Sequence, residues 1–544
     1  MRAFRNCKGV ITIFVALMMA GILSLGTFVL EAARLQAART QLDQAAASAA
    51  SSMLSAYNLD LEERFGVFAM DTTRTNDETC ADYVRYNSDL AADAYGNNVT
   101  RLYRVTDVKM KGVYNLTYPH ILKRQLLTLA KYNLPPEVSA FNKYNAHYIL
   151  GELQTKCQYV SDKMQKILDF AQDGNPEALG EDLRNAMAAL DQTFGGVAKA
   201  NTAHGVTLND STVAKLPSVT DTVESTIPES INLSAVDMFY AWNDPFQVDD
   251  QGAIVAVRPE YLYELPDACK RLADTVNAAI NMLWENMDEN VLLNMYVSQM
   301  FSNRRHVTDQ YIGPGLESTE SGSEDLTFAK ACCEYVFGGD ASELQNQEAA
   351  YDYIMALRLI GNLYATLGDF DVTDGCSAAT GMALAYYETC LDLYLLTEYD
   401  MAVPLRKDRQ ILRADNLGAI ADAFSGHDPA SALYDLGYYD EAIAGFVITG
   451  ADLLDYTDSL NLALWMVPNT QKLLRVADLM QLEMRYQQRY VEGLPATFLM
   501  SEQNTYCRVE CKGKMNAILP IIAIGGEEHS LQGLSLSTLK YAGY

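Results

Sequence analysis

The stretch from Val10 to Leu30, VITIFVALMMAGILSLGTFVL, contains no charged residue. As a helix, its 21 residues would be about 31 Å long, close to the thickness of the hydrocarbon core of a bilayer. Three basic residues lie within residues 1–9, and Glu31 follows the stretch directly. Because basic residues favour the cytoplasmic side, we expect a single-pass cell-membrane protein with a cytoplasmic N-terminus and an extracellular remainder.

A cleaved secretory signal peptide is the alternative interpretation of the same stretch. The apolar part of a signal peptide usually has 7–15 residues and ends at a cleavage site of small residues. This stretch is longer, and it runs without a turn signal into the helical pattern EAARLQAARTQLDQAAASAASSMLSAY. The length and the continuity favour a permanent anchor, here assigned to residues 10–30.

Residues 31–57 continue the predicted helix with a heptad pattern of mostly small side chains. The pattern consists of Leu35, Leu42, Ala49 and Ala56, with Ala38, Ala45 and Ser52 at the offset of three. Such a seam lets another backbone approach closely. Two interpretations stay open: the seam packs on copies or partner subunits, or it packs on the chain's own domain. Under the first, Ala45→Leu with Ala49→Leu would disturb assembly and leave the ectodomain folded.

The chain is acidic, with a formal net charge of −29 over 544 residues. An acidic surface repels nucleic-acid phosphates, so we expect no nucleic-acid partner. Hydrophobic residues make up 49% of the sequence, which is typical of a globular protein. The chain is long enough for more than one folding unit.

Cysteines and histidines form no recognisable site in the sequence. Nine of the 10 cysteines lie after Leu30, at wide spacings that define no disulfide framework. Neither a zinc-type spacing nor an HExxH, GxSxG, GxGxxG or Walker motif occurs. Asp369 begins a stretch that resembles a calcium loop, but Gly375 falls one position late for an EF-hand. We therefore expect no enzyme, metal or cofactor.

The periodicity predicts a mainly α protein of the α+β class. It has a transmembrane helix continuing into an extracellular helix, then a helical ectodomain with strands near its start and at its C-terminus. The predicted segments are a cytoplasmic end (1–9), the anchor (10–30), a stalk helix (31–57), strands plus helices (58–199), a linker or β excursion (200–260), a helical part (261–494) and a β segment (495–544).

The first 70 residues resemble the N-terminal region of TadE/TadG-like proteins of Flp pilus assembly loci, in the variant of Gram-positive Firmicutes with a large ectodomain. Lys8-Gly9 match the basic residue and glycine before the anchor, and Glu31 matches the acid that ends it. Arg34 matches the basic residue of the following helix, and 42–50 its Ala-rich run. Processed pseudopilins of this type carry Glu at the fifth residue after the scissile glycine, where this chain has Phe14.

The resemblance implies a structural or assembly component of a Tad/Flp-type pilus or a related secretion apparatus. Its partners would be the lipid bilayer and other membrane-anchored subunits, with self-association through the stalk helix. The residues expected to serve anchoring and helix packing are Lys8, Gly9, Glu31, Arg34, Leu35, Leu42, Ala45 and Ala49. An anchored adhesin or binding scaffold unrelated to pili is the alternative.

Overall fold

The computed structural model describes a defined set of residues, and all structural statements below refer to them. These are residues 7–71, 75–89, 102–133, 143–174, 246–248, 254–257, 287–305, 331–339, 343–369, 402–405, 453–488, 492–495, 497–517, 521–524, 527–530 and 533–544, with single positions and short pieces between 269–277 and 381–397. Most of them are helical, as predicted, and a small antiparallel sheet includes the C-terminal strand. The chain divides into two units, Met1–Gln125 with Phe498–Tyr544, and Leu126–Thr497.

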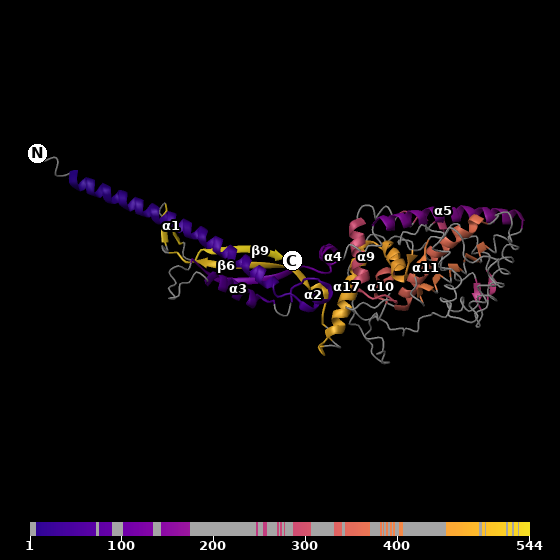
Figure 1. Cartoon of the computed structure of the whole chain (residues 1–544). Helices are drawn as coiled ribbons and strands as arrows, with labels where there is room; N and C mark the ends of the chain where they lie inside the picture. Colours follow the sequence, from indigo (N-terminus) through magenta and orange to yellow (C-terminus); the bar gives the residue numbers. More distant parts are fainter. Residues whose placement is uncertain are drawn as a thin grey trace. The chain divides into compact units, whose positions relative to one another are not determined.

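The first unit is built around one long helix, α1 (Cys7–Leu54), which joins the predicted anchor and stalk without a break. Two shorter helices follow, α2 (Leu59–Phe65) and α3 (Asp77–Asp89). Gly66 ends α2 at a φ of 65°, a left-handed conformation that glycine adopts without steric cost. Figure 1 shows the C-terminal half of α1 lying along the sheet, while its N-terminal half extends beyond the strands.

The sheet of the first unit joins the two ends of the chain. Its strand order is β1 (Tyr103–Asn115), β6 (Asn504–Met515) and β9 (Ser535–Gly543), and all neighbours are antiparallel. A short hairpin, β7 (Ile521–Ile524) with β8 (Glu527–Ser530), stands between β6 and β9 in the sequence. The period-two pattern predicted β1 and the C-terminal strands, but it did not predict that they pair with each other.

The core of the first unit lies between one face of this sheet and the helices α1 and α3. Every second residue of β6 is buried, because alternate side chains of a strand point to opposite faces. Residues Cys507, Val509 and Cys511 of β6 are buried in one cluster with Cys80 and Val84 of α3. The sheet therefore has a covered inner face and an outer face.

The second unit is mainly helical. Its longer described helices are α5 (Lys143–Gly174), α9 (Met287–Met300), α10 (Cys332–Gly338), α11 (Glu343–Asp369), α16 (Tyr456–Trp465) and α17 (Asn469–Tyr486), and α4 (Pro119–Asn133) spans the boundary at Gln125. Two small hairpins accompany them, β2 (Phe246–Val248) with β3 (Ile254–Val257), and β4 (Val403–Pro404) with β5 (Leu453–Leu454).

Two local predictions differ from the structure. The run of polar residues before Cys80 predicts a loop, yet Asp77 begins α3. The amide oxygen of Asn76 accepts a hydrogen bond from the backbone N–H of Thr79 at 2.8 Å, an N-cap signal that marks the helix start. The periodicity predicts a helix that ends at 453–454, but these residues pair with β4, and α16, which lies in the part predicted to be helical, begins just after them. Most of the predicted linker at 200–260 lies outside the described residues.

Candidate functional site

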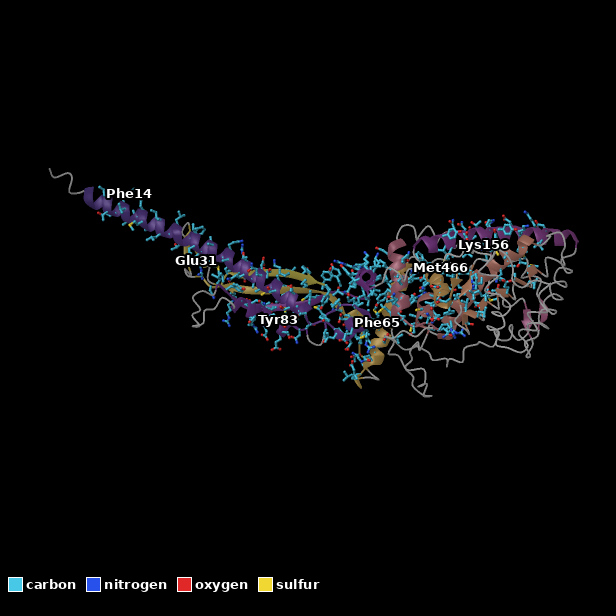
Figure 2. All side chains as sticks on the ribbon, in the orientation of Figure 1. Phe14, Glu31, Phe65, Tyr83, Lys156 and Met466 are labelled. Carbon is cyan, nitrogen blue, oxygen red and sulfur yellow. The ribbon has the colours of Figure 1, made fainter. Side chains whose placement is uncertain are left out.

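The exposed part of α1 is the most conspicuous surface of the described residues. From Ile11 to Leu30 its large apolar side chains are about half exposed or more, with Phe14 at 62% and Leu17 at 68%. It is the one helix among the described residues that is long and apolar enough to cross a membrane. Figure 2 shows Phe14 on the part of α1 that no other element covers. An uncovered apolar surface of this extent has no stable place in water.

The boundary between the exposed and the covered parts of α1 falls at Glu31 and Arg34. Glu31 is 1% exposed, and its carboxylate lies 3.8 Å from Nε of Arg34, three residues further along the helix. Nη2 of Arg34 donates a hydrogen bond to the backbone oxygen of Asn516 at 3.1 Å. Arg34 therefore connects α1 to the chain just after β6, and Glu31 lies beside it on the same helix. Lys8 and Gly9 lie within α1, and the surroundings of the Lys8 side chain are outside the described residues.

The small-residue seam of α1 packs on the chain's own first unit. Leu42, Ala45 and Ala49 are at most 3% exposed, and they share a hydrophobic cluster with α3 and β6. Leu35 is half-buried against the same cluster. Small side chains bring the helix backbone close to the sheet, so that few atoms separate them. Of the two interpretations left open by the sequence, the structure shows the intramolecular one for these residues.

Both ends of the covered part of α1 are tied to the C-terminal segment. Near its start, the guanidinium of Arg34 donates a hydrogen bond to the backbone oxygen of Asn516. In the middle, Asp43 pairs with Lys540 of β9 at 3.1 Å and accepts a hydrogen bond from Thr538. At the end, the hydroxyl of Tyr544 donates to the backbone oxygen of Leu54. The sheet thus runs along the helix from residue 34 to residue 54.

Three thiols lie in the core of the first unit. Burial raises the pKa of Cys80 and of Cys511 to about 12, and that of Cys507 to about 11. The thiolate is the reactive form of cysteine, so these groups are inert near neutral pH. They behave as apolar core residues, and the three are free thiols in this structure.

The second unit contains a buried polar interior centred on α10. The carboxylate of Glu334 accepts hydrogen bonds from the Tyr456 hydroxyl and from the backbone N–H of Arg304, both at 2.9 Å. The hydroxyl of Tyr335 donates to Asp478 at 2.8 Å. Each of these buried groups fixes one helix against another, which is a structural role. Among the described residues, no group of three or more histidine, cysteine or acidic side chains could hold a metal ion.

Sequence reasoning missed the outer face of the sheet. The basic residues of β1 and β6 were recognised only as parts of strands, whereas the pairing of these strands gathers them on one surface. The signal was present, because the alternation of β6 already separates Arg508, Lys512 and Lys514 from the buried positions. What the sequence lacked was the partner strand, which lies about 400 residues away.

The chain matches no protein-family model, no curated protein and no solved structure.

Proposed function

We propose that the protein is a single-pass, membrane-anchored structural subunit of a Tad/Flp-type pilus or a related secretion apparatus. The observation that carries the proposal is α1, which is bare and apolar up to Leu30 and packs one face against its own unit from Glu31 onward. This division suits a helix whose first half lies in lipid and whose second half packs within an extracellular unit. The pilus setting rests on the sequence resemblance of the first 70 residues.

The proposed orientation places the N-terminus in the cytoplasm and the whole chain after Leu30 outside. Basic residues precede the anchor and an acid follows it, in the order that the positive-inside rule associates with this topology. In this setting the protein carries no catalytic step of its own. Its contribution is to position an acidic ectodomain next to other anchored subunits.

The test combines membrane fractionation, mass spectrometry and co-purification from the cell that makes the protein. We expect the chain in the membrane fraction, resistant to carbonate extraction and enriched with the pilus or secretion subunits. An intact N-terminus marks a permanent anchor, and a mature start at Val10 marks pilin-type processing. A mature start at or after Glu31, or a chain that fractionates away from every pilus subunit, contradicts the proposal, the latter in favour of an anchored adhesin or scaffold.

A pair of matched variants tests the anchor itself. Leu17→Arg with Leu25→Arg places two charges in the predicted span, each costing about 3 kcal/mol near the middle of a bilayer. We expect this variant to leave the membrane fraction. Leu17→Ile with Leu25→Ile is the control and should stay in it. Equal membrane retention of both variants would contradict the assignment.

A further inference from the structure

A short apolar strand stands at one end of the sheet in the first unit. Strand β7 has the sequence IIAI, and the chain contains no polar side chain from Ala517 to Ile524. Its partner β8 has the sequence EEHS, so that Ile524 lies opposite Glu527 and Ala523 lies opposite Glu528. One strand of this hairpin is therefore wholly apolar, and the other is polar and acidic.

The β7–β8 hairpin forms a separate two-stranded sheet, which pairs with no other strand among the described residues. A two-stranded hairpin is at best marginally stable in water, and packing against an apolar surface stabilises it. Successive residues of a strand belong to opposite faces, so an unbroken apolar run is typical of strands with apolar surroundings on both faces. Strand β7 thus has the composition of a strand that is surrounded by apolar material.

The hairpin leaves and rejoins the sheet beside the helix α1. At its base, the backbone N–H of Gly533 donates to the backbone oxygen of Met515 at 2.9 Å, and the N–H of Met515 donates to Leu534 at 3.0 Å. The next residue, Asn516, accepts the hydrogen bond from Arg34 of α1. Figure 1 shows the hairpin, in yellow, at the end of the sheet towards the N-terminus of α1. The contact with Arg34 therefore fixes the base of the hairpin next to the helix.

The position of Arg34 on α1 sets the height of this base above the predicted membrane span. Arg34 lies four residues after Leu30, or about 6 Å along the helix axis. The hydrocarbon core of a bilayer is about 30 Å thick and the whole bilayer about 40–45 Å, so each head-group layer is about 5–8 Å thick. With Leu30 at the edge of the core, the hairpin begins within the head-group layer. Strand β7 is about 13 Å long, which brings it within reach of the acyl chains.

We propose that the β7–β8 hairpin is a second membrane contact, in which β7 enters the outer leaflet beside α1 and β8 faces the water. Its ligand is thus the phospholipid leaflet that α1 itself crosses, and the inference rests on the proposed anchoring. Amphipathic segments bind membranes in this way, with the apolar side about 5–10 Å deep at the boundary between head groups and acyl chains. The acids of β8 favour neutral lipids, because anionic head groups repel carboxylates.

Two membrane contacts restrict how the first unit moves on its anchor. A single helix leaves the attached unit free to turn about the helix axis, whereas a second contact away from that axis opposes both rotation and tilt. The hairpin lies between β6 and β9 in the sequence, so the two contacts come from opposite ends of the chain. A subunit held in one orientation loses less rotational freedom when it joins an assembly, which favours assembly in the membrane.

The experiment uses the full-length protein in phosphatidylcholine liposomes, with a photoreactive benzophenone amino acid at one position at a time. The positions are Ile522 of β7, Leu17 of the predicted span, and Tyr541 of β9, which is 57% exposed. After illumination, mass spectrometry identifies the molecule that each benzophenone has joined. We expect phospholipid adducts at Ile522 and Leu17, and about tenfold fewer at Tyr541, because it is seven residues beyond Leu534, or about 23 Å along the strand.

A matched pair of variants tests whether the apolar character of β7 is responsible. With the benzophenone at Ile522, Ile521→Asp with Ile524→Asp should lower the yield of lipid adducts about tenfold, because charged groups are unfavourable in lipid. Ile521→Val with Ile524→Val is the control and should keep the yield. Cys511 should stay protected from alkylation in both variants, which reports that β6 remains packed.

The Leu17 position separates the two proposals. A chain without lipid adducts at Leu17 contradicts the proposed anchoring. Lipid adducts at Leu17 with none at Ile522 contradict the second contact, and so do adducts of Ile522 to the chain itself in place of lipid, or equal lipid labelling at Ile522 and Tyr541. Full labelling in a folded aspartate variant contradicts it as well. If that variant exposes Cys511, the comparison of the three positions without further substitution decides.

Discussion

At the scale of single residues, Lys472 is the clearest case of a group whose chemistry the fold has changed. It is fully buried in the second unit, where Nζ donates to the amide oxygens of Asn290 at 3.1 Å and Asn294 at 2.7 Å. A neutral amine has two N–H groups, which these two oxygens satisfy, whereas an ammonium has three. Burial accordingly lowers the pKa of Lys472 to about 7.

The buried lysine makes the stability of the second unit depend on pH. The unfolded lysine keeps its proton up to about pH 10, while the folded one loses it near pH 7, so the unfolded state binds more protons between these values. Stability therefore rises with pH across this window. We expect urea unfolding of the wild type to gain about 2 kcal/mol from pH 7 to pH 9 relative to Lys472→Met. Lys166→Met, at an exposed lysine, is the control, and equal pH profiles for Lys472→Met and wild type would contradict the assignment.

At the scale of secondary-structure elements, the small-residue seam of α1 is compatible with packing on another subunit or on the chain's own domain. The seam of small residues predicts close packing, but it does not say on what. The structure supplies the sheet and α3 as the partners. We therefore revise the expectation that Ala45→Leu with Ala49→Leu would spare the ectodomain, since both positions are at most 3% exposed within the core of the first unit.

We now expect Ala45→Leu with Ala49→Leu to destabilise the first unit. Each larger side chain overpacks the gap between helix and sheet, at a cost of about 1–3 kcal/mol. Alkylation at pH 8 followed by mass spectrometry measures the effect, because Cys80, Cys507 and Cys511 react only when the core opens. Ala37→Leu with Ala47→Leu, at exposed positions of the same helix, should leave the thiols protected. Equal protection in both variants would contradict the overpacking argument.

Local patterns predicted many elements because their cause is local. Alternation of apolar and polar residues predicts β1, and helical periodicity predicts α4, α11 and α17. The miss at α3 has a local cause too, since α3, like α16, begins at a capping residue whose polarity resembles a loop. In α16, the carboxylate of Asp455 accepts from the backbone N–H of Asp458 at 2.7 Å. The strand at 453–454 is different, because its pairing with β4 depends on contacts distant in sequence.

At the scale of the whole molecule, the main feature is that the two ends of the chain build one unit. Strand β6 is the middle strand of its sheet, and it pairs with β1 on one side and with β9 on the other. The second unit is inserted between β1 and β6. The first unit therefore forms only after the whole insertion has been synthesised, because β1 and β6 are far apart in the sequence.

Truncation after Thr497 tests this dependence. Without β6 and β9 the seam of α1 and the inner side of α3 lose their cover, so we expect Cys80 to become reactive towards alkylating reagents. Cys333 of the second unit should stay protected, because its burial involves only residues of that unit. Peptide mass spectrometry after alkylation reads both thiols in one sample, with the full-length chain as control. Continued protection of Cys80 in the truncated chain would contradict the shared-unit arrangement.

The sequence by itself determined the properties that depend on neighbouring residues. An uncharged stretch from Val10 to Leu30 is long enough to span a bilayer in any fold, and alternation or helical periodicity sets the local elements. Only the tertiary structure decided what the helix after Glu31 packs on and which residues share the outer face of the sheet. Both depend on β6 meeting β1 across about 400 residues, and strand pairing over that distance leaves no periodic trace in either segment.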